Sequence, residues 1–571
     1  MIKRHKTVSI ALVTLLSTTT LLMPASYNSS AEHNDGPSPT IEEKKHKNTY
    51  FKAHSTFSWD EPGPTSPVLH PGSPTGAGMV EQPLDGIDPI MEEMIENQVM
   101  PGAVAFIARR GHIVKHDAYG YAYQYTDDEF TEAENPIDMQ ENTIFDLASI
   151  SKIFTTTAAM KLYEEGYFEL DDPVANYLPE FAENDKEDVT IRQLMTHTAG
   201  FPAWIPLYTQ GDNREERLQI VLEYPLDNDP GESYTYSDLN MITLGVLIER
   251  LSGQRLDEFV KKHITDPLKM EDTMYNPPKS LKHRIAATEY QPYIDRGLVW
   301  GEVHDENAWS LDGVAGHAGV FSTASDLAKL AHMFVNDGRY GGKQILQEET
   351  VKLLAENQIP QFPGNDHGLG WELGQGWYMD ALTEGNTLGH TGYTGTSIVI
   401  NQNNDTIAIL LTNRVHPTRE TVSTNFARRD LARQVADSIP VSIPNDGEAW
   451  FSGYGDNIEH NLTAEVDIAE DSLLSFETWY RIESNYDYGY IEVSEDGEEW
   501  NQLKSFTDRN VNWEHNTVEI PANTKYIRFR YQTDGSVNSR GWYINNVKIE
   551  YPNGDMIEPD LAGDGWIERE Y

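Results

Sequence analysis

Two segments with the alternation of β-hairpins lie at opposite ends of one long stretch of the chain. Residues 102–122 (GAVAFIARRGHIVKHDAYGYA) alternate around Arg110-Gly111, and residues 396–414 (TSIVINQNNDTIAILLTNR) alternate around a turn at 403–405. Helical periodicity dominates residues 149–275, and residues 424–439 (TNFARRDLARQVADSI) predict a closing helix. Strands at both ends with helices between them predict an α+β domain whose sheet joins the two ends, over residues 83–441.

The pattern of the chain changes near residue 442. Segments such as LLSFETWYRI (473–482) and YGYIEVSEDGEEW (488–500) are strand-like, and Asp496-Gly497 is a strong hairpin signal. We therefore predict an all-β sandwich over residues 442–571. Residues 32–82 are polar and rich in Pro and Gly, as in EPGPTSPVLHPGSPTGAG, and predict a flexible linker.

The first 31 residues have the pattern of a secretory signal peptide. Basic residues at Lys3, Arg4 and Lys6 precede an apolar stretch over residues 8–23 and then small residues, with a predicted cut after Ala31. The alternative is an uncleaved anchor. No later segment is long and apolar enough to cross a bilayer. We expect a secreted protein, extracellular or associated with the cell wall.

Composition excludes several classes of function. The chain has 43 basic and 91 acidic residues and a net charge of −48, so nucleic-acid phosphates would repel it. It has no cysteine, which rules out disulfides, thiolate metal sites and lipid attachment to an N-terminal cysteine. The acidity is spread along the chain and indicates a solvated coat rather than a cationic substrate.

Ser149 and Lys152 stand one helical turn apart at the start of an apolar helical pattern. A serine hydroxyl is a poor nucleophile until a neighbouring base takes its proton. Lysine can be that base only where burial or positive charge lowers its pKa. By itself the pair also fits a helix cap with a solvated lysine.

Three further segments favour the catalytic interpretation. YSDLN (236–240) places Tyr236 at a loop-to-helix corner, where a phenol can relay protons. GHTGYTG (389–395) is glycine-rich and lies beside a predicted strand whose N–H groups could face an oxyanion. LMTHTAGFPAW (194–204) ends a helix in a glycine turn. Singly they fit a buried tyrosine, a loop and a structural turn.

In this order and spacing, the four segments resemble the serine β-lactamase and penicillin-binding-protein superfamily, in its class C-like branch, over about residues 84–440. The resemblance implies an antiparallel sheet flanked by helices, with an α-rich subdomain. It makes Ser149 the acylated nucleophile and gives proton transfer to Lys152 and Tyr236. The remaining substrate-strand and oxyanion-hole residues that it implies are His390, Thr391, Gly392 and Tyr393, with the N–H groups of Ser149 and Tyr393 forming the hole.

Two positions depart from what is common in that branch. Asp238 stands where most members have Asn, and its anion can pair with Lys152 and raise the pKa of the lysine. His390 stands where many have Lys. With an ordinary pKa near ~6.5, histidine is a cation only on the acidic side, so we expect a carboxylate substrate to bind less well as pH rises.

Residues 301–330 (GEVHDENAWSLDGVAGHAGVFSTASDLAKL) and 411–418 (LTNRVHPT) look like exported cell-wall members of the superfamily. These include N-acetylmuramyl-L-alanine amidases and D-alanyl-D-alanine carboxypeptidases. Within them His304, Asp305, Asn307 and His317 are candidates for substrate contact. Satisfying the backbone of their loops is an equal alternative.

The C-terminal region resembles the β-sandwich of immune-inhibitor-A-type secreted metallopeptidases, without the HExxH motif of the peptidase. Such domains imply attachment to a wall polymer or surface, and sometimes structural calcium. The acceptable oxygen ligands are Asp456, Asn457, Asp487 and Asn545. Acidic loops are common in this chain, so ordinary loop residues are the favoured interpretation.

Together these features predict a serine hydrolase that works through an acyl-enzyme, with no metal or other cofactor in its chemistry. Its leading substrate is a peptidoglycan-derived peptide or amide. One alternative is an esterase or β-lactam hydrolase on the same residues. Another is a penicillin-sensing or wall-binding protein that does not turn over, which the intact set Ser149, Lys152 and Tyr236 disfavours.

Overall fold

The computed structural model describes residues 64–571, except 445–446 and 511. The predicted signal peptide and residues 32–63 of the predicted linker lie outside the described residues. Residues 64–82 correct the linker prediction, because they pack against the α+β domain. His70–Pro71 (β1) pairs with β3 (His112–Tyr125), and Ala77 and Met79 are buried. Apolar side chains among the prolines and glycines supply this anchoring, which the composition of the segment does not show.

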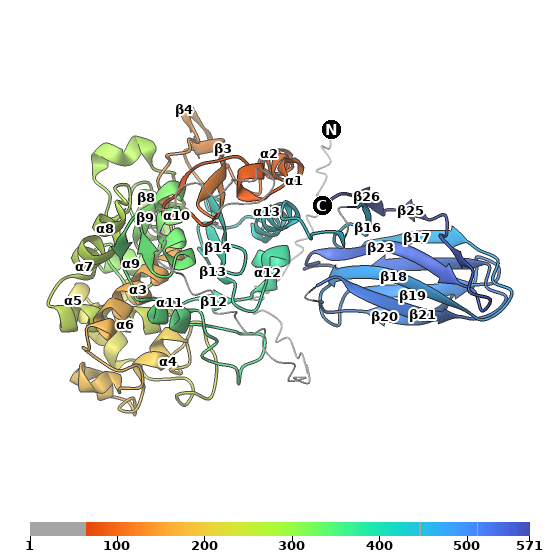
Figure 1. Ribbon diagram of the computed structural model, residues 1–571. Coiled ribbons are helices and arrows are strands. Elements are labelled where there is room, and N and C mark those ends of the chain that lie inside the picture. The colour runs from red at the N-terminus through yellow and green to blue at the C-terminus, as the bar shows by residue number, and fades with distance from the viewer. Residues whose placement is uncertain (1–63, 445–446, 511) are drawn as a thin grey trace, which may run out of the picture. The chain divides into compact units, whose positions relative to one another are not determined.

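The central sheet joins both ends of the α+β domain, as expected. Its order is β1-β3-β2-β15-β14-β13-β12, and β2 pairs antiparallel with β15 (Figure 1). The predicted hairpins are β2–β3 and β14–β15. The remaining bounds are β2 Gly102–Arg109, β4 Glu132–Asp138, β12 Glu372–Leu373, β13 Leu388–Thr391, β14 Ser397–Asn401 and β15 Thr406–Thr412.

Alternation along the strands divides the core into two layers. In β2, Val104 and Phe106 face one cluster, and Ala105 and Ile107 face the other. Helices α1 (Glu81–Asp85), α2 (Ile87–Glu96) and α13 (Asn425–Asp437) cover the second face, and α13 is the predicted closing helix. Helix α10 (Ala324–Val335) packs on the first face. Because both faces are covered, these strands read as almost continuous apolar runs.

An α-rich region completes the first face. Its central helices are α3 (Ser151–Glu164) and α6 (Asp238–Ser252), which pack on each other and are buried along most of their lengths. A small sheet of β5 (Phe145–Asp146), β9 (Val320–Ser322) and β6 (Met274–Tyr275) leads into α3. The other helices are α4 Ile191–Met195, α5 Arg214–Glu223, α7 Leu256–Val260, α8 Asp266–Leu268, α9 Glu306–Ser310, α11 Glu348–Leu354 and α12 Gly376–Met379.

The C-terminal region is all-β, as predicted. One sheet has the order β21-β18-β23-β16-β26 and the other β20-β19-β22-β17-β25, and side chains of both form one core. The bounds are β16 Ala449–Phe451, β17 Glu459–Glu465, β18 Ser472–Arg481, β19 Tyr488–Ser494, β20 Asn501–Phe506, β21 Glu514–Ile520, β22 Tyr526–Gln532, β23 Gly541–Glu550, β24 Met556–Ile557, β25 Ala562–Asp564 and β26 Ile567–Arg569. Within the described ranges, no helix has the length and hydropathy needed to span a membrane.

Candidate active site

Ser149 lies in a short turn between β5 and α3, directly after a strained residue. Ala148 has a φ of 47°, a left-handed conformation that is costly for a residue with a Cβ. The Ala148 N–H donates to Asp146 Oδ1 at 2.8 Å, and the Asp146 carboxylate is buried. Asp146 therefore helps to hold the backbone bend that presents Ser149 at the start of the helix. Asp146 was not among the predicted site residues, although it lies three positions before Ser149 in the segment FDLASISK (145–152).

Lys152 has no exposed surface, and its Nζ lies 2.8 Å from Ser149 Oγ. It also forms an ion pair with Asp238 Oδ1 at 2.8 Å, the pairing that the sequence suggested, and donates to the backbone oxygen of His317 at 3.3 Å. Burial favours the neutral amine, but the charge of Asp238 outweighs it and raises the pKa of Lys152 above its ordinary value. In the resting site Lys152 is thus an ammonium that donates to Ser149.

Tyr236 lies at the corner before α6, where Ser237 caps the helix by accepting from the Leu239 N–H. Its ring centroid is 4.8 Å from Lys152 Nζ. Burial raises the pKa of Tyr236, whereas the ammonium of Lys152 acts to lower it. Once Tyr236 has lost its own proton, its phenolate, held beside both the ammonium and the serine, is placed to take the serine proton.

His197 supports the corner at Tyr236 and Ser237. Residues 194–204 are therefore more than the structural turn that was the alternative for this segment. The His197 ring is buried, and Nδ1 accepts from the Ser237 N–H at 3.2 Å. The His197 and Tyr236 ring centroids are 4.7 Å apart. Burial holds the pKa of His197 well below its usual range, so the ring stays neutral and acts as an acceptor. The available signal in the sequence was the histidine within the segment LMTHTAGFPAW.

The glycine-rich segment 389–395 runs along the end of β13, close to the residues that precede Ser149. Thr396 Oγ1 donates to the Leu147 oxygen at 3.2 Å, and Thr394 Oγ1 donates to the Asp146 oxygen at 2.8 Å. A Cβ on Gly392 would lie 2.4 Å from the Leu147 oxygen, so only glycine fits this approach. Strand β12 pairs with Leu388 and Gly389, and the following residues extend past it. Tyr393 and Thr391 are thus on the segment that borders the nucleophile, and their substrate roles stay predictions.

His390 differs from the expectation of a titrating cation. Its Nδ1 lies 2.8 Å from the carbonyl oxygen of Thr391, which can only accept, so Nδ1 carries the hydrogen. Burial, followed by the charge of Lys152, lowers the pKa of His390 to about 3. The expected loss of carboxylate binding with rising pH is therefore wrong, because the ring is already neutral. Its Nε2 is a hydrogen-bond acceptor.

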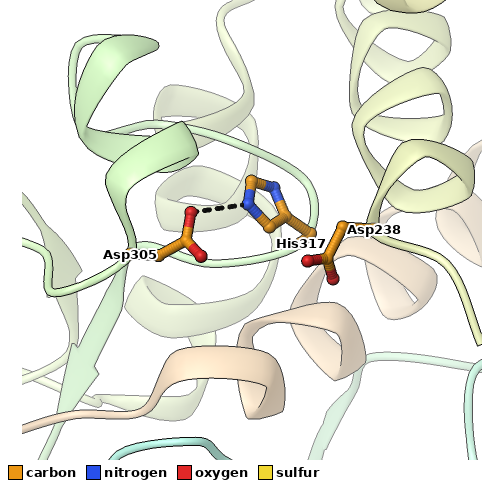
Figure 2. Close-up of side chains that lie close together, drawn as sticks. All are labelled: Asp238, Asp305 and His317. Carbon is orange, nitrogen blue, oxygen red and sulfur yellow. Dashed lines mark hydrogen bonds and ion pairs between the residues drawn. The ribbon is translucent and has the colours of Figure 1, made fainter. Parts of the chain in front are cut away.

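Asp305 and His317 lie close to Asp238 (Figure 2), and Asp238 forms the ion pair with Lys152. His317 Nε2 lies 2.9 Å from Asp305 Oδ1, and Asp305 caps α9 by accepting from the Ala308 N–H at 2.7 Å. One ligand atom of each of the three residues lies within 4.8 Å of the others, a spacing that a metal ion would accept. Lys152 already supplies a positive charge to Asp238 here, and a reaction without a metal stays a prediction.

His304 and Asn307 hold loops together. The His304 N–H donates to Asp146 Oδ2 at 2.6 Å, and its ring nitrogen lies 2.9 Å from Glu289. Asn307 accepts from the Tyr208 N–H and donates to a backbone oxygen. The backbone interpretation fits Asn307, whereas the His304 ring also stacks on Tyr393 with the ring centroids 5.8 Å apart, and the substrate roles of both residues stay predictions. Of the four polar candidates in residues 301–330, the structure brings Asp305 and His317 to the neighbourhood of Lys152.

Comparison with known proteins decides the family, since the family model described as "Beta-lactamase" matches residues 87–433. The chain belongs to the beta-lactamase family. A member from Escherichia coli K12 named "Putative D-alanyl-D-alanine carboxypeptidase" is 34% identical over 383 residues, which cover 61% of this chain and 86% of that protein. One from Salmonella agona SL483 with the same name is 33% identical over 396 residues, 63% of this chain and 89% of the relative.

Two solved structures are similar to this chain over 63% of its length, each with a TM-score of 0.49. They are EstCE1, a hydrolase with promiscuous acyltransferase activity (23% identity, 98% of its chain), and a penicillin-binding-protein homologue from Caulobacter crescentus (18% identity, 99% of its chain). As a member of the beta-lactamase family, the protein is a serine hydrolase with the β-lactamase-like fold.

Proposed function

We propose that the protein is a secreted hydrolase of the class C-like branch that acts on cell-wall peptides through an acyl-enzyme on Ser149. The observation that carries this proposal is the contact of 2.8 Å between Ser149 Oγ and Lys152 Nζ, with Tyr236 beside both. The names of the relatives support a D-alanyl-D-alanine carboxypeptidase type of substrate.

In this mechanism Tyr236 first loses its proton, and the ammonium of Lys152 stabilises the resulting phenolate. The phenolate accepts the proton of Ser149 as Oγ attacks the substrate carbonyl, and Tyr236 then gives this proton to the leaving group. The backbone N–H groups of Ser149 and Tyr393 hold the oxyanion. Water repeats the sequence on the acyl-enzyme and releases Ser149.

The neutral state of His390 favours a second candidate, an amidase or esterase whose substrate has no carboxylate at this point. A cation attracts a substrate carboxylate, whereas the free Nε2 of a neutral imidazole accepts a hydrogen bond. An amide N–H or a hydroxyl of the substrate satisfies that acceptor. Under this candidate the catalytic residues and the acyl-enzyme are unchanged.

Defined muropeptides with a free carboxylate or an amidated C-terminus test the proposal, with the products identified by mass. Turnover of the free-carboxylate peptide with release of its terminal residue supports the carboxypeptidase. Turnover of the amidated peptide alone, or of a chromogenic ester alone, supports the second candidate. A single stoichiometric burst with a penicillin and no turnover of any substrate contradicts both and favours a sensor.

Ser149→Ala should abolish turnover and covalent labelling by a fluorophosphonate or a penicillin. Labelling that persists and maps to another serine contradicts the assignment. Ser151 is a suitable control residue, since it lies two positions after Ser149 and is buried, and its Oγ accepts from the Val320 N–H. Ser151→Ala should reduce stability but keep the labelling.

Secretion and wall attachment belong to the same proposal. The signal-like start supports export, and a β-sandwich of the immune-inhibitor-A type supports binding to a wall polymer. Co-sedimentation of the whole chain with purified peptidoglycan tests the attachment, and equal recovery with and without the polymer contradicts it.

A further inference from the structure

Three acidic side chains meet at one end of the β-sandwich. Glu483 follows β18, Asp487 precedes β19, and Asp534 follows β22. The pairing of Tyr488 with Gln532 brings the start of β19 beside the end of β22. The Asp534 N–H then donates to Asp487 Oδ1 at 2.8 Å. The cluster is thus built by the register of two strands and by the loop between β18 and β19.

The loop that carries Glu483 and Asp487 is tightly folded. The Asp487 N–H donates to the Glu483 oxygen at 3.1 Å, and Thr507 Oγ1 donates to the same oxygen at 3.2 Å. Asn485, between them, takes a left-handed φ of 66°. These bonds direct both acidic side chains of the loop toward Asp534, with one carboxylate oxygen from each of the three within 4.8 Å of the others.

Asp487 has an oxygen that nothing in the described part of the chain satisfies. The residue has no exposed surface, and its Oδ2 is buried without a hydrogen-bond partner among the described residues. A buried carboxylate oxygen normally has a donor or a cation beside it, because losing water without a replacement is costly. This oxygen is the observation that distinguishes the cluster from an ordinary acidic loop.

The acidic cluster near the active site makes the contrast clear. There the ammonium of Lys152 lies on Asp238, and His317 binds Asp305. In the sandwich, the carboxylates of Glu483 and Asp534 lie beside Asp487 and add like charge to it. The chain supplies a positive charge to the first cluster, whereas carboxylates surround Asp487 in the second.

We propose that Glu483, Asp487 and Asp534 bind a divalent cation, and that calcium is the ion that fits best. Calcium takes carboxylate oxygens at about 2.3–2.6 Å, so two of its ligands can lie up to about 5 Å apart. Magnesium holds its ligands at about 2.0–2.1 Å in near-ideal octahedral geometry and usually keeps several waters, so a site of three protein carboxylates suits it less. The bound ion joins the β18–β19 loop to the end of β22.

This site differs from the calcium ligands suggested by the sequence. Asp487 is common to both. Asp456 forms ion pairs with Arg429 and Arg433, which already balance its charge. The Asn457 N–H donates to the Asp534 backbone oxygen, and the Asn545 side chain accepts from the next backbone N–H. Glu483 and Asp534 take the places of these three residues.

Titration calorimetry with calcium chloride tests the site on the chain after treatment with a chelator. We expect saturable binding of one ion, and a rise of about 5 °C or more in the Tm of the sandwich when calcium exceeds the Kd about 50-fold. Asp487→Asn and Asp534→Asn keep the shape of each side chain and remove a charge. Each should weaken calcium binding at least tenfold. Glu519→Gln, on an exposed position of β21 in the same sandwich, should leave it unchanged.

The thermal melts separate a metal ligand from a merely structural residue. As a ligand, Asp487 should give an Asn variant that is as stable as the wild type without calcium and fails to respond when calcium is added. A purely structural Asp487 would give equal losses of Tm with and without calcium. That result, or wild-type protein that binds no calcium, would overturn the proposal. Binding of magnesium in preference to calcium would overturn the choice of ion.

Activity on a small soluble ester should be the same with calcium and with chelator, because the catalytic residues lie outside the sandwich. Failure of the calcium site therefore leaves the proposed hydrolase intact. Failure of the hydrolase assay likewise leaves the calorimetry unaffected.

Discussion

Replacing Asp238 with Asn should move the rising limb of the pH profile of kcat/KM to lower pH. In the resting site the ammonium of Lys152 and the carboxylate of Asp238 balance, and Tyr236 is neutral. Removing one proton to make the active base then leaves a net negative charge in a buried site. In the Asn variant the same loss of a proton turns a net positive site into a neutral one.

The size of the effect follows from the burial of the pair. Lys152 is fully buried and the Asp238 side chain is 17% exposed. Removing one partner of a buried pair costs about 3–5 kcal/mol, because the other charge loses its partner. With 1.36 kcal/mol for each pH unit, the limb should move down by about 2–4 pH units. The two groups titrate as a unit, so this holds whether the proton leaves Lys152 or Tyr236.

Stability should change with pH in a direction fixed by the same argument. In the wild type the pKa of Lys152 is higher in the folded chain than in the unfolded chain. The ion pair therefore contributes its full stabilisation below the unfolded pKa, and this stabilisation is lost as pH rises through the folded pKa. In the variant burial lowers the pKa of Lys152, so the unfolded chain binds the extra proton. The free energy of unfolding of the variant should therefore increase with pH between the new pKa and about 10.4.

The assay is kcat/KM for a soluble ester between pH 5 and 10, with denaturant unfolding at the same pH values. Other titrating groups nearby do not imitate the shift. His197 and His390 stay neutral, and Glu372, whose pKa burial raises to about 7, is present in both proteins. Asp117→Asn is the matched control, because Asp117 also pairs with a lysine, Lys115, at 2.8 Å, on strand β3, which carries none of the catalytic residues. A limb that stays in place in Asp238→Asn refutes the reasoning.

Two other substitutions test the parts that hold Ser149. Gly392→Ala places a Cβ 2.1 Å from Thr396 Oγ1, so it should destabilise the fold by about 1–3 kcal/mol and lower kcat by about 10²-fold. The control Gly385→Ala has open space around its Cβ and should do neither. A normal kcat in Gly392→Ala contradicts the close approach of β13. In Asp146→Asn the single side-chain oxygen can accept from only one of the two N–H groups, those of Ala148 and His304. We therefore expect kcat to fall more than KM rises, while the pH profile keeps its shape. A change in KM alone contradicts a positioning role.

The alternation of apolar residues and the turn residues predicted the hairpins and several strands from short segments of the sequence. The two hairpins turn where their Arg-Gly and Asn-Asn-Asp segments predict, and residues 473–482 and 488–500 supply strands of the sandwich. The pairing of Lys152 with Asp238 could also be predicted from the sequence, because the two residues lie in motifs whose order along the chain is specific. The prediction for residues 64–82 was wrong because Ala77 and Met79 are buried in a cluster whose other members include residues of α2 and α13. The composition of the segment does not show these contacts.

Burial and contacts distant in sequence account for the rest. His390 was assigned an ordinary pKa because a sequence does not state that its ring is enclosed beside Lys152. Asp146 gains its role from His304, 158 positions away. Glu483 and Asp534 come together only through the pairing of β19 with β22. Each depends on the register of elements that the local pattern leaves open.

The two departures from the class C-like pattern act on the charge of the substrate site in the same direction. A lysine at position 390 would add a cation, and an asparagine at position 238 would remove an anion. With His390 neutral and Asp238 ionised beside Lys152, these two positions add no net positive charge to the site. A substrate carboxylate is then attracted weakly, so KM for the free-carboxylate peptide should be nearly flat between pH 5 and 8.

Restoring the positive charge should therefore create a preference for carboxylates. A favourable contact near a protein surface at about 4 Å is worth up to about 4 kcal/mol, and burial of the new lysine will reduce this. We expect His390→Lys to lower KM for the free-carboxylate peptide about tenfold and to leave KM for its amidated form unchanged. The double variant with Asp238→Asn should exceed the sum of the single effects, because both changes act on one charged group within one site. Additive effects, or equal changes for the carboxylate and amidated peptides, would show that neither position sets the preference for the substrate terminus.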